Sequence, residues 1–208
     1  MNNKLRNQLL DLVPEGLHSR LAIAGGYAAD PEKAEDIDLW VLEVRPAEFD
    51  RIEQEIREHL AAQDRMGTPV GIPARTPGNP EMYDEHEGNF RVVAIQAVED
   101  HIHPFGQLIR RVQIIITAQP TLRALVNTFD VSTHAIGYML LDSEFEGFSC
   151  AEDYTSVHCQ PRVLKFDRPE QTLPRIKKIA ARYGFEPLAD DIAQLAFASL
   201  AGYAEVPF

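Results

Sequence analysis

The chain of 208 residues has the length of one domain, or of one domain with a small appendage. Its 45% hydrophobic and 25% charged residues are ordinary for a globular protein and supply enough apolar side chains for a core. The formal net charge of −12 argues against nonspecific binding to a nucleic-acid backbone, and no apolar run approaches the roughly 20 residues of a membrane span.

The cysteines and the N-terminal sequence bear on the compartment. Cys150 and Cys159 are the only cysteines in the sequence, and two make neither a disulfide framework nor a zinc site. The opening sequence MNNKLRNQLL lacks the apolar segment of a secretory signal. We therefore predict a cytoplasmic protein.

The first predicted elements are a helix and a short strand. Residues 3–13 place leucines at helical spacing, and Pro14 ends this helix. Residues 21–24 form an apolar run that stops at Gly25-Gly26. Glycine permits a sharp turn and lets a ligand approach the main chain closely. We expect this turn to present backbone N–H groups that suit a phosphate.

The next predicted strand carries two acids on one face. Asp36 and Asp38 are two residues apart, so on a strand they point to the same side, while Ile37 and Leu39 point to the other. Two adjacent carboxylates repel each other and resist burial. A cation between them removes this difficulty, and magnesium takes such oxygen ligands together with substrate phosphates.

A helix, an irregular segment and several strands follow. Apolar residues recur at helical spacing over 46–63, which predicts an amphipathic helix. Residues 64–89 are rich in proline and glycine, so we predict a long loop, either a lid over a substrate or a mobile insertion. The β-branched residues of 90–97 and 111–117 predict two strands.

The remaining chain is predicted to alternate between helix and strand. This prediction comprises a helix over 120–129, a strand over 130–141 broken near Gly137, a short strand over 161–166, a helix that starts at 167–170 with Asp167 as its cap and continues over 173–183 to end at Gly184, and a packed apolar helix over 188–203. We therefore divide the chain into a core over 1–148 and a small, mostly helical segment over 149–208 that packs on it.

The charge is distributed unevenly. Residues 160–184 hold seven basic and two acidic side chains, a net charge of +5. An anionic ligand should therefore meet the C-terminal segment.

The glycine turn and the paired acids carry a family resemblance. The order Ala24-Gly25-Gly26, nine further residues and Asp36-Ile37-Asp38-Leu39 resembles the motif of the nucleotidyltransferase superfamily typified by DNA polymerase beta. The resemblance implies an α+β nucleotidyltransferase fold, with a mixed β-sheet flanked by helices. It also implies a Mg²⁺ or Mn²⁺ ion on the two aspartates and a nucleoside triphosphate at Gly25 and Gly26.

A third carboxylate on a neighbouring strand is typical of this superfamily. The obvious position is the middle of the strand 111–117, where this sequence has Gln113. Glutamine cannot supply the negative charge that a second metal ion needs. Asp130, at the start of the next predicted strand, is the alternative that we favour as the third metal ligand. A structural aspartate at a strand edge is the other interpretation of Asp130.

A second, looser resemblance covers much of the later chain. A VQII strand, a helix and an FD strand over 112–130 are similar to a subgroup of viral and related nucleotidyltransferase-like proteins. The basic helix LPRIKKIAARYGFE, which ends in Gly-Phe, resembles the corresponding helix of that subgroup. This order suggests that the C-terminal segment covers the nucleotide.

Several other polar groups are weaker candidates. Arg162 and Lys165 could each contact a triphosphate, although they lie on opposite faces of the predicted strand. The basic face of the helix 173–183 could bind RNA or a phosphate tail, or be merely solvated. The stretch 99–103, EDHIH, is expected to be a structural loop rather than a metal site, since it has no distant partner ligand. His134 could orient a substrate or be structural.

These features predict a magnesium-dependent nucleotidyltransferase. Asp36, Asp38 and Asp130 would hold the metal while a nucleoside monophosphate moves from a triphosphate to an acceptor hydroxyl, with release of pyrophosphate. The acceptor, which could be RNA, a protein or a small molecule, is not identified by the sequence. Gln113 favours a different function, an inactive nucleotidyltransferase-like binding or regulatory module. A metal-dependent phosphohydrolase with the same aspartates is a third hypothesis.

Overall fold

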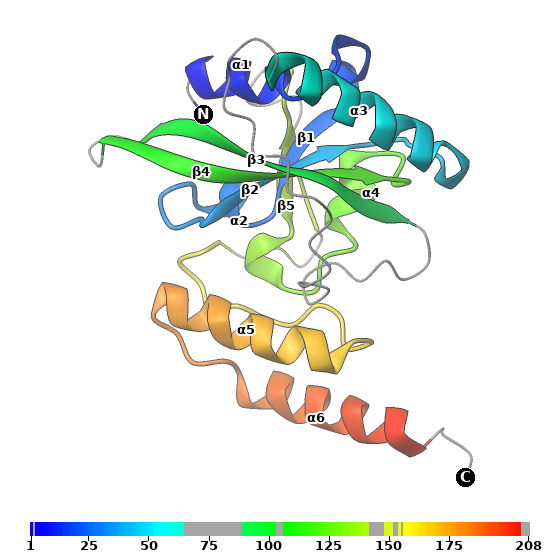
Figure 1. The fold of residues 1–208 in the computed structure, drawn as a ribbon. Helices are drawn as coiled ribbons and strands as arrows, with labels where there is room; N and C mark the ends of the chain where they lie inside the picture. The colour runs from blue at the N-terminus through cyan, green and yellow to red at the C-terminus, as the bar shows by residue number, and fades with distance from the viewer. Residues whose placement is uncertain are drawn as a thin grey trace.

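A computed structural model describes residues 1, 3–64, 89–102, 106–141, 148–151, 154 and 156–204. Its centre is a six-stranded sheet in the order β3-β4-β2-β1-β5-β6 (Figure 1). The strands are β1 (Leu21–Ala24), β2 (Asp36–Val41), β3 (Phe90–Ile102), β4 (Gly106–Thr117), β5 (Ile136–Met139) and β6 (Phe148–Cys150). β2 and β4 run parallel and the other neighbours run antiparallel. The predicted α+β class with a mixed sheet is confirmed.

Helices lie on both sides of this sheet. The α-helices are α1 (Asn3–Asp11), α2 (Gly26–Ala29), α3 (Phe49–Asp64), α4 (Leu122–Val126), α5 (Pro169–Tyr183) and α6 (Ala189–Ala204), and the short 3-10 turns are η1 (Glu15–Arg20), η2 (Pro46–Glu48) and η4 (Ser132–His134). In Figure 1, α1 and α3 lie above the sheet, and α5 and α6 lie below it. No helix in the described part of the chain is both long and apolar enough to cross a membrane.

The main core fills the space between the sheet and the pair α1 and α3. Leu5 and Leu9 from α1 and Ile56 from α3 are fully buried there against alternate residues of the strands. On β2 these alternate residues are Ile37 and Leu39. Apolar residues recur every second position along the strands and about every 3.6 positions along the helices. Each element therefore has one apolar face, and these faces pack together, as predicted.

The opposite face of the sheet carries a smaller core and the polar site residues. Trp40 is buried there with Ile115 and with the helix α4. Its ring lies 6.1 Å from that of Phe129, measured between centroids. Because Asp36 and Asp38 share the face of Trp40, this apolar cluster forms one end of a surface whose other end is acidic.

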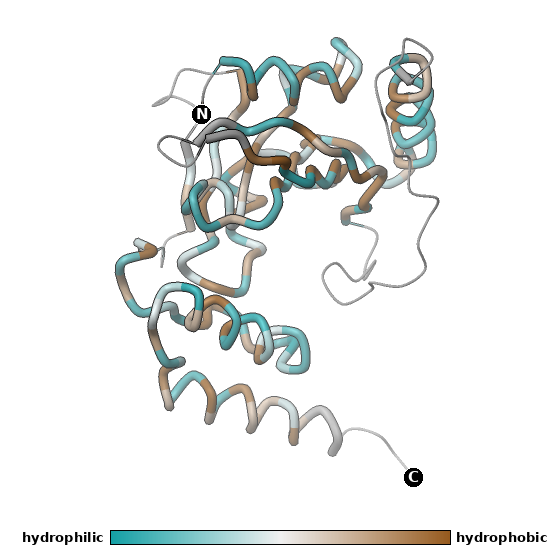
Figure 2. The backbone as a smooth tube through the Cα atoms, turned by 60° about the vertical axis from the view of Figure 1, so that its left-hand side comes forward, coloured by the Kyte–Doolittle hydropathy of each residue, from teal (hydrophilic) through white to brown (hydrophobic). Residues whose placement is uncertain are grey.

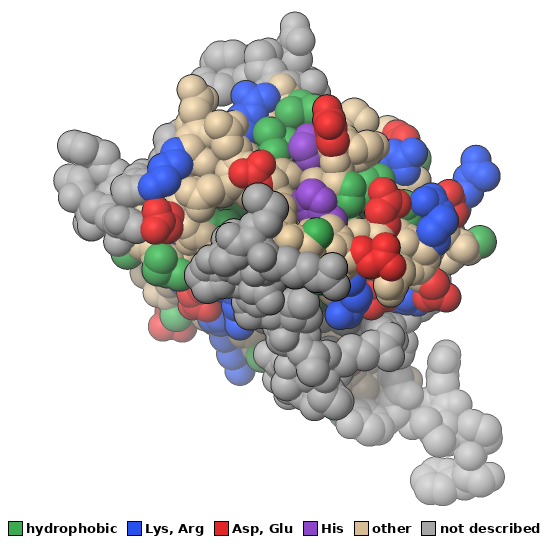
Figure 3. All heavy atoms as spheres, turned by 45° about the horizontal axis from the view of Figure 1, so that its top comes forward, with side chains coloured by type: hydrophobic (Ala, Val, Ile, Leu, Met, Phe, Trp, Pro, Cys, Tyr) green, Lys and Arg blue, Asp and Glu red, His purple; other side chains and the backbone are tan. Residues whose placement is uncertain are grey.

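The outer surface over α1 and α3 is mixed in charge. Figure 3 shows this side, and acidic and basic side chains are interspersed over its coloured part. Along α3, Arg51 pairs with Glu55 and Arg57 with Glu53. Such neutralised helical pairs give no continuous basic surface on this helix.

The β3–β4 hairpin is longer than the sequence indicated. We predicted that the first strand would stop at residue 97, but β3 continues to Ile102 and β4 already begins at Gly106. The stretch 99–102 is therefore strand rather than loop, and residue 103 lies outside the described residues. Asp100 is buried in this extension because Arg110 from β4 pairs with it at 3.2 Å.

Three predictions about the region after α4 were wrong. The predicted strand 130–141 is interrupted by η4, and within the described part of the chain residues 161–166 make only one bridge, between Val163 and Val131. The N–H of Ser132 donates to the carbonyl of Arg162, and its Oγ accepts from the N–H of Arg162, so these two groups do not join the ladder of a neighbouring strand. The residue before α5 is Arg168, not Asp167, and it makes no side-chain capping bond.

The C-terminal helices share a small separate core. Ile176 and Ile179 from α5 and Leu195 from α6 pack with Val131 and Val163. Figure 2 shows α6 below α5, with much of its length apolar.

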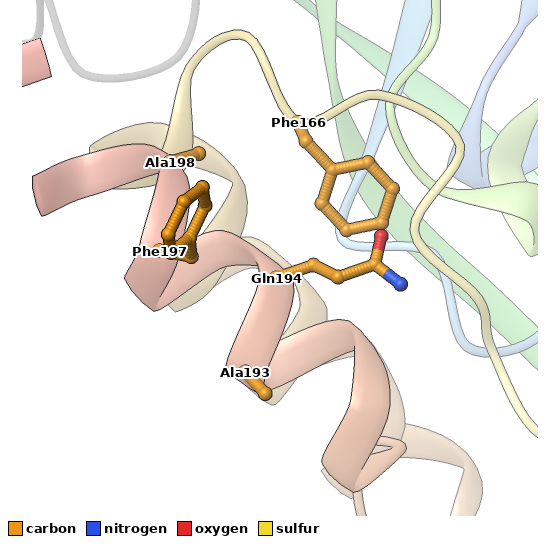
Figure 4. Close-up of a pocket in the computed structure, with 5 residues that line it drawn as sticks. All are labelled: Phe166, Ala193, Gln194, Phe197 and Ala198. Carbon is orange, nitrogen blue, oxygen red and sulfur yellow. The ribbon is translucent and has the colours of Figure 1, made fainter. Parts of the chain in front are cut away.

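One side of α6 faces outwards, contrary to the prediction that this helix is packed. Phe197 and Leu200 are 75% and 70% exposed. Phe197 and Gln194 line a shallow groove of about 440 Å³ together with Phe166 (Figure 4).

Candidate functional site

The strand β2 places Asp36 and Asp38 side by side. Both are partly exposed, whereas Ile37 between them and Leu39 after them are completely buried on the opposite face. The alternation has the physical origin we expected, since successive side chains on a strand point to opposite faces. The two carboxylates therefore open on the face of the sheet that α1 and α3 do not cover.

The glycine turn lies directly beside Asp38. Gly25 follows β1 with a φ of 95°, a conformation that residues with a Cβ rarely adopt. A Cβ at Gly25 would lie 3.3 Å from Oδ2 of Asp38. Glycine is thus required here by both its backbone conformation and the close approach of a carboxylate. The predicted neighbourhood of turn and acidic strand is present in the structure.

The turn offers fewer backbone donors than its sequence suggested. The N–H of Gly25 donates to the carbonyl of Ile136 at 2.9 Å, and the carbonyls of Gly25 and Gly26 accept from Ala29 and Asp30. The Gly25 amide is therefore committed to holding β1 against β5. A phosphate at this turn would have to use later amides or simply the space left by the missing side chains.

Gln113 lies where the third carboxylate was sought. The parallel pairing of β2 and β4 sets Asp38 opposite Gln113 and Asp36 opposite Arg111. The side-chain amide of Gln113 donates to Oδ2 of Asp36 at 2.9 Å, and the guanidinium of Arg111 reaches the same oxygen at 3.2 Å. A neutral donor and an exposed cation thus stabilise Asp36 from the neighbouring strand.

Asp130 is bound to α5. Its Oδ2 accepts a hydrogen bond of 2.9 Å from the hydroxyl of Thr172, and its Oδ1 accepts one of 2.7 Å from the guanidinium of Arg175. Both oxygens are therefore engaged by the helix, and the carboxylate ties the C-terminal segment to the core. A role for Asp130 as third metal ligand stays a prediction.

The basic face of α5 points at acids of the core. Lys178 and Arg182 both donate to the carboxylate of Glu35 at 2.8 Å. The hydrogen bond from Lys178, with the charge of Arg182 nearby, lowers the pKa of Glu35. The sequence singled out this basic face but not its partners. Glu35, immediately before Asp36, gave no signal beyond its charge.

His134 sits at the junction of these groups. Its ring lies where a side chain on Gly26 would be, since a Cβ there would be 3.4 Å from the ring carbon Cε1. Burial, together with the positive charges of Arg182 and Arg175 and against the opposing effect of Asp130, lowers the pKa of His134 to about 4. The ring is therefore neutral at pH 7, and its buried Nε2 has no hydrogen-bond partner among the described residues.

The two predicted phosphate-binding cations, Arg162 and Lys165, lie in the segment before α5. The main chain of Arg162 pairs with Ser132, while its side chain is exposed, and Lys165 is half-buried. Among the contacts of the described residues, neither cation is paired with Asp36. Their predicted contact with a nucleotide stays a prediction. The predicted loop 64–89 lies, apart from its two end residues, outside the described residues.

Two solved structures have a similar architecture. A CCA-adding enzyme in complex with CTP matches 100% of this chain with 16% sequence identity and a TM-score of 0.52. The Thermotoga maritima CCA-adding enzyme complexed with tRNA matches 100% of this chain with 15% identity and a TM-score of 0.52. The chain has the fold of these CCA-adding enzymes.

This likeness concerns the fold alone. It confirms the predicted α+β fold with a mixed sheet flanked by helices. The chain spans 44% and 45% of the two CCA-adding chains, less than half of their length. No family model and no curated protein matches the sequence.

A divalent metal ion was predicted at Asp36 and Asp38, and the chemistry of these two carboxylates fits one such ion. Magnesium is commonly held by one or two carboxylates that leave room for water and substrate phosphates. Within the described ranges, no three or more His, Cys, Asp or Glu side chains converge as a metal site. The donor set of the described residues therefore suits one ion supported by a substrate, rather than two ions held by protein alone.

Proposed function

We propose that this chain is a metal-dependent nucleotidyltransferase that moves a nucleoside monophosphate from a nucleoside triphosphate to an acceptor hydroxyl. The observation that carries the proposal is the juxtaposition of Asp36 and Asp38 on one face of β2, with Oδ2 of Asp38 only 3.3 Å from the position of a Cβ on Gly25. The fold shared with CCA-adding enzymes supports the same assignment.

The proposal gives each part of the site a role. Asp36 and Asp38 would hold Mg²⁺ or Mn²⁺, with Asp130 as a further ligand if it is released from α5. The ion, when bound, would neutralise phosphate charge and favour ionisation of the acceptor hydroxyl. Gly25 and Gly26 would let the triphosphate lie close to the main chain.

Other residues would orient the nucleotide and balance its charge. Arg162 and Lys165 would supply positive charge near the phosphates. On the same proposal, residues 149–208 act as a helical segment that packs on the core 1–148.

In this transfer, one bond to the α-phosphorus forms and one bond to it breaks. The acceptor oxygen forms a bond to the α-phosphorus, and the bond from that phosphorus to the oxygen bridging the α- and β-phosphates breaks. Pyrophosphate leaves with the electron pair of that bond, and the acceptor hydroxyl loses its proton to solvent or a nearby base. The chain contributes mainly position and charge, which are the main sources of catalysis in phosphoryl transfer.

The acceptor can be narrowed only by analogy. The structures that share the fold contain CTP in one case and tRNA in the other. We therefore place an RNA hydroxyl first among the acceptors, with a protein or small molecule as the alternatives. Incubation of the protein with each labelled triphosphate and cell extract will show which fraction takes up the label.

The direct test uses Asp36→Asn and Asp38→Asn. Each variant removes a charge while keeping the shape, so we expect folding to persist and Mg²⁺-dependent release of pyrophosphate to disappear. Asp11→Asn, which changes an exposed aspartate on α1, is the matched control and should retain full activity. Full activity in either site variant would refute the proposal.

One observation favours a second function, that of an inactive binding module. Gln113 donates to Asp36 without a metal and leaves the strand position of a third carboxylate neutral. Such a module would bind a nucleotide or a partner but transfer nothing. A wild-type protein that releases no pyrophosphate, yet is stabilised by a triphosphate with Mg²⁺, would have this function.

A further inference from the structure

Behind the candidate site, a buried polar network joins three elements. Asp100 on β3 and Arg110 on β4 form an ion pair of 3.2 Å, with only 3% and 5% of their side chains exposed. The hydroxyl of Tyr27 on α2 donates to the same carboxylate oxygen at 3.2 Å. The Arg110 guanidinium also lies 5.7 Å from the centre of the Tyr27 ring. Burial and the Asp100 charge both raise the pKa of Tyr27, which therefore stays a neutral donor.

The same guanidinium holds the loop that leads to Asp36. Arg110 donates to the carbonyls of Pro31 and Ala34, both of which lie in the link between α2 and β2. This link joins the glycine turn to the acidic strand. Within it, the N–H groups of Glu32, Lys33 and Ala34 donate to Asp30, so the link is a compact turn rather than an extended tether, with Arg110 on its inner side.

The network lies on the other face of the sheet from the carboxylates. Tyr27 and Ala34 belong to the core under α1 and α3, and Arg110 shares the strand face of Val112 and Ile114 in that core. Arg110 can therefore influence Asp36 only through the main chain. A buried ion pair is weak support for stability, because apolar residues of similar volume often serve equally well. An apolar pair, however, could not donate hydrogen bonds to the two loop carbonyls, as Arg110 does.

We infer that Arg110 and Asp100 are positioning residues, which fix the link 30–35 and thereby the placement of Asp36 and Asp38 against the glycine turn. This inference rests on the proposed function, because it concerns the geometry of that same site. Asp100 orients the guanidinium, Arg110 holds the two carbonyls, and Tyr27 attaches α2 to the same point. The two ends of the motif are thus held by one buried cluster.

The outer side of the link is held by weaker contacts. Lys33 lies 4.9 Å from the centre of the Tyr183 ring, and Glu35 pairs with Lys178 and Arg182 of α5. The side chain of Glu35 is 60% exposed, so water and salt screen these pairs. The inner contacts through Arg110 are buried, and they should dominate the position of the link.

The test compares paired removal of the buried charges with removal of an exposed pair. The double variant Asp100→Leu/Arg110→Met leaves no unpaired buried charge, so it should fold. It removes the partners of the Tyr27 hydroxyl and of the two link carbonyls, so we expect a lower Tm than that of the wild type. We expect hydrogen exchange at the amides of Glu32, Lys33 and Ala34 to accelerate by about tenfold. Affinity for a triphosphate with Mg²⁺, measured by calorimetry, should fall by about tenfold.

The control variant Lys4→Met/Glu99→Gln removes an exposed ion pair between α1 and the same hairpin and should change neither quantity. If the double variant does not fold, Arg110→Lys keeps the charge beside Asp100 but cannot reach both carbonyls, and it should show the same two effects. Wild-type exchange and wild-type affinity in the variant that folds would overturn the inference.

Hydrogen exchange needs no nucleotide, so it tests the hold of Arg110 on the link independently of the proposed function. If the wild type binds no triphosphate but exchange in the link still accelerates, the proposed function fails while the hold of Arg110 on the link stands. If exchange stays unchanged while the wild type binds a triphosphate, the inference fails and the proposed function stands.

Discussion

The side-chain amide of Gln113 donates a hydrogen bond of 2.9 Å to Oδ2 of Asp36, from the strand directly beside it. This bond gives Asp36 a neutral partner at the position where a metal-binding carboxylate was sought. A donor that stabilises a carboxylate without any ion also reduces its need for one. Substitution of Gln113 therefore tests directly whether the site binds a metal ion.

Gln113→Glu would convert this donor into a third acid. In EDTA the new carboxylate repels Asp36 and no longer donates the hydrogen bond that Gln113 supplies, so we expect a loss of about 1–3 kcal/mol in the free energy of unfolding. Mg²⁺ should reverse this loss and raise Tm more than it does for the wild type. Thermal melts with and without Mg²⁺ measure both effects.

Gln194→Glu is the control for that change, because Gln194 is exposed on α6 and far along the chain from β2. Its response to Mg²⁺ should equal that of the wild type. An equal response from Gln113→Glu as well would show that no ion binds in contact with residue 113.

Gly25→Ala tests the conformation of the turn. Gly25 has a φ of 95°, and an added Cβ would press on the carboxylate of Asp38. We expect a loss of about 1–3 kcal/mol in stability from backbone strain. Binding of a triphosphate should weaken as well, because Asp38 is displaced.

Gly16→Ala provides the matched comparison, since nothing lies within 4 Å of a Cβ at that position. Urea unfolding of the two variants should show a loss only for Gly25→Ala. Equal stability of the two would mean that the turn can relax without strain.

The sequence was a good guide to features that depend on local periodicity. The alternation around Asp36 and Asp38 follows from the geometry of any strand, and the turn at Gly25 follows from the lack of a side chain. Both could be placed without knowing what packs against them. Their proximity in space follows from the antiparallel pairing of β1 with β2.

Features that depend on distant partners could not be predicted in this way. Asp130 pairs with Thr172 and Arg175, which lie 42 and 45 residues further along the chain. Asp100 can be buried in a strand only because Arg110, on the other strand of the hairpin, forms an ion pair with it. The apolar pattern of α6 indicated a helix, but it held no information on which side would remain uncovered.

Asp130→Asn tests the attachment of α5. The substitution removes the charge that pairs with Arg175 in a partly buried position, so we expect a loss of about 1–3 kcal/mol in the free energy of unfolding. Glu35→Gln, which weakens the exposed pairs with Lys178 and Arg182, should lose no more than about 1 kcal/mol. Urea unfolding of both variants gives the comparison.

The order of these two losses is the decisive result. If Glu35→Gln is the more damaging substitution, α5 is held mainly at its C-terminal end and Asp130 is available for another role. If Asp130→Asn is the more damaging, the carboxylate has a structural role that any metal binding must share.

His134 should make the stability of the protein depend on pH. Burial lowers its pKa to about 4 in the folded state, whereas the unfolded chain has the ordinary value of about 6.5. Between these values the unfolded state binds more protons, so acid favours unfolding. The contribution of neutral His134 to the free energy of unfolding is fully present above pH 6.5 and is lost progressively as the pH falls towards 4. At pH 5 the protonation of this one group should lower the free energy of unfolding by about 2 kcal/mol.

His134→Gln removes the titrating group. Carboxylates also titrate in acid, but they are the same in the variant and the wild type, so the difference between the two proteins isolates the contribution of His134. Urea unfolding in EDTA at pH 7.5 and pH 5 should show a smaller loss for the variant by about 2 kcal/mol. His158→Gln, at an exposed histidine, should keep the wild-type dependence on pH. If His134→Gln loses as much stability in acid as the wild type, the imidazole is not held neutral by its burial beside Gly26, and water or a rearranged α5 must solvate its protonated form.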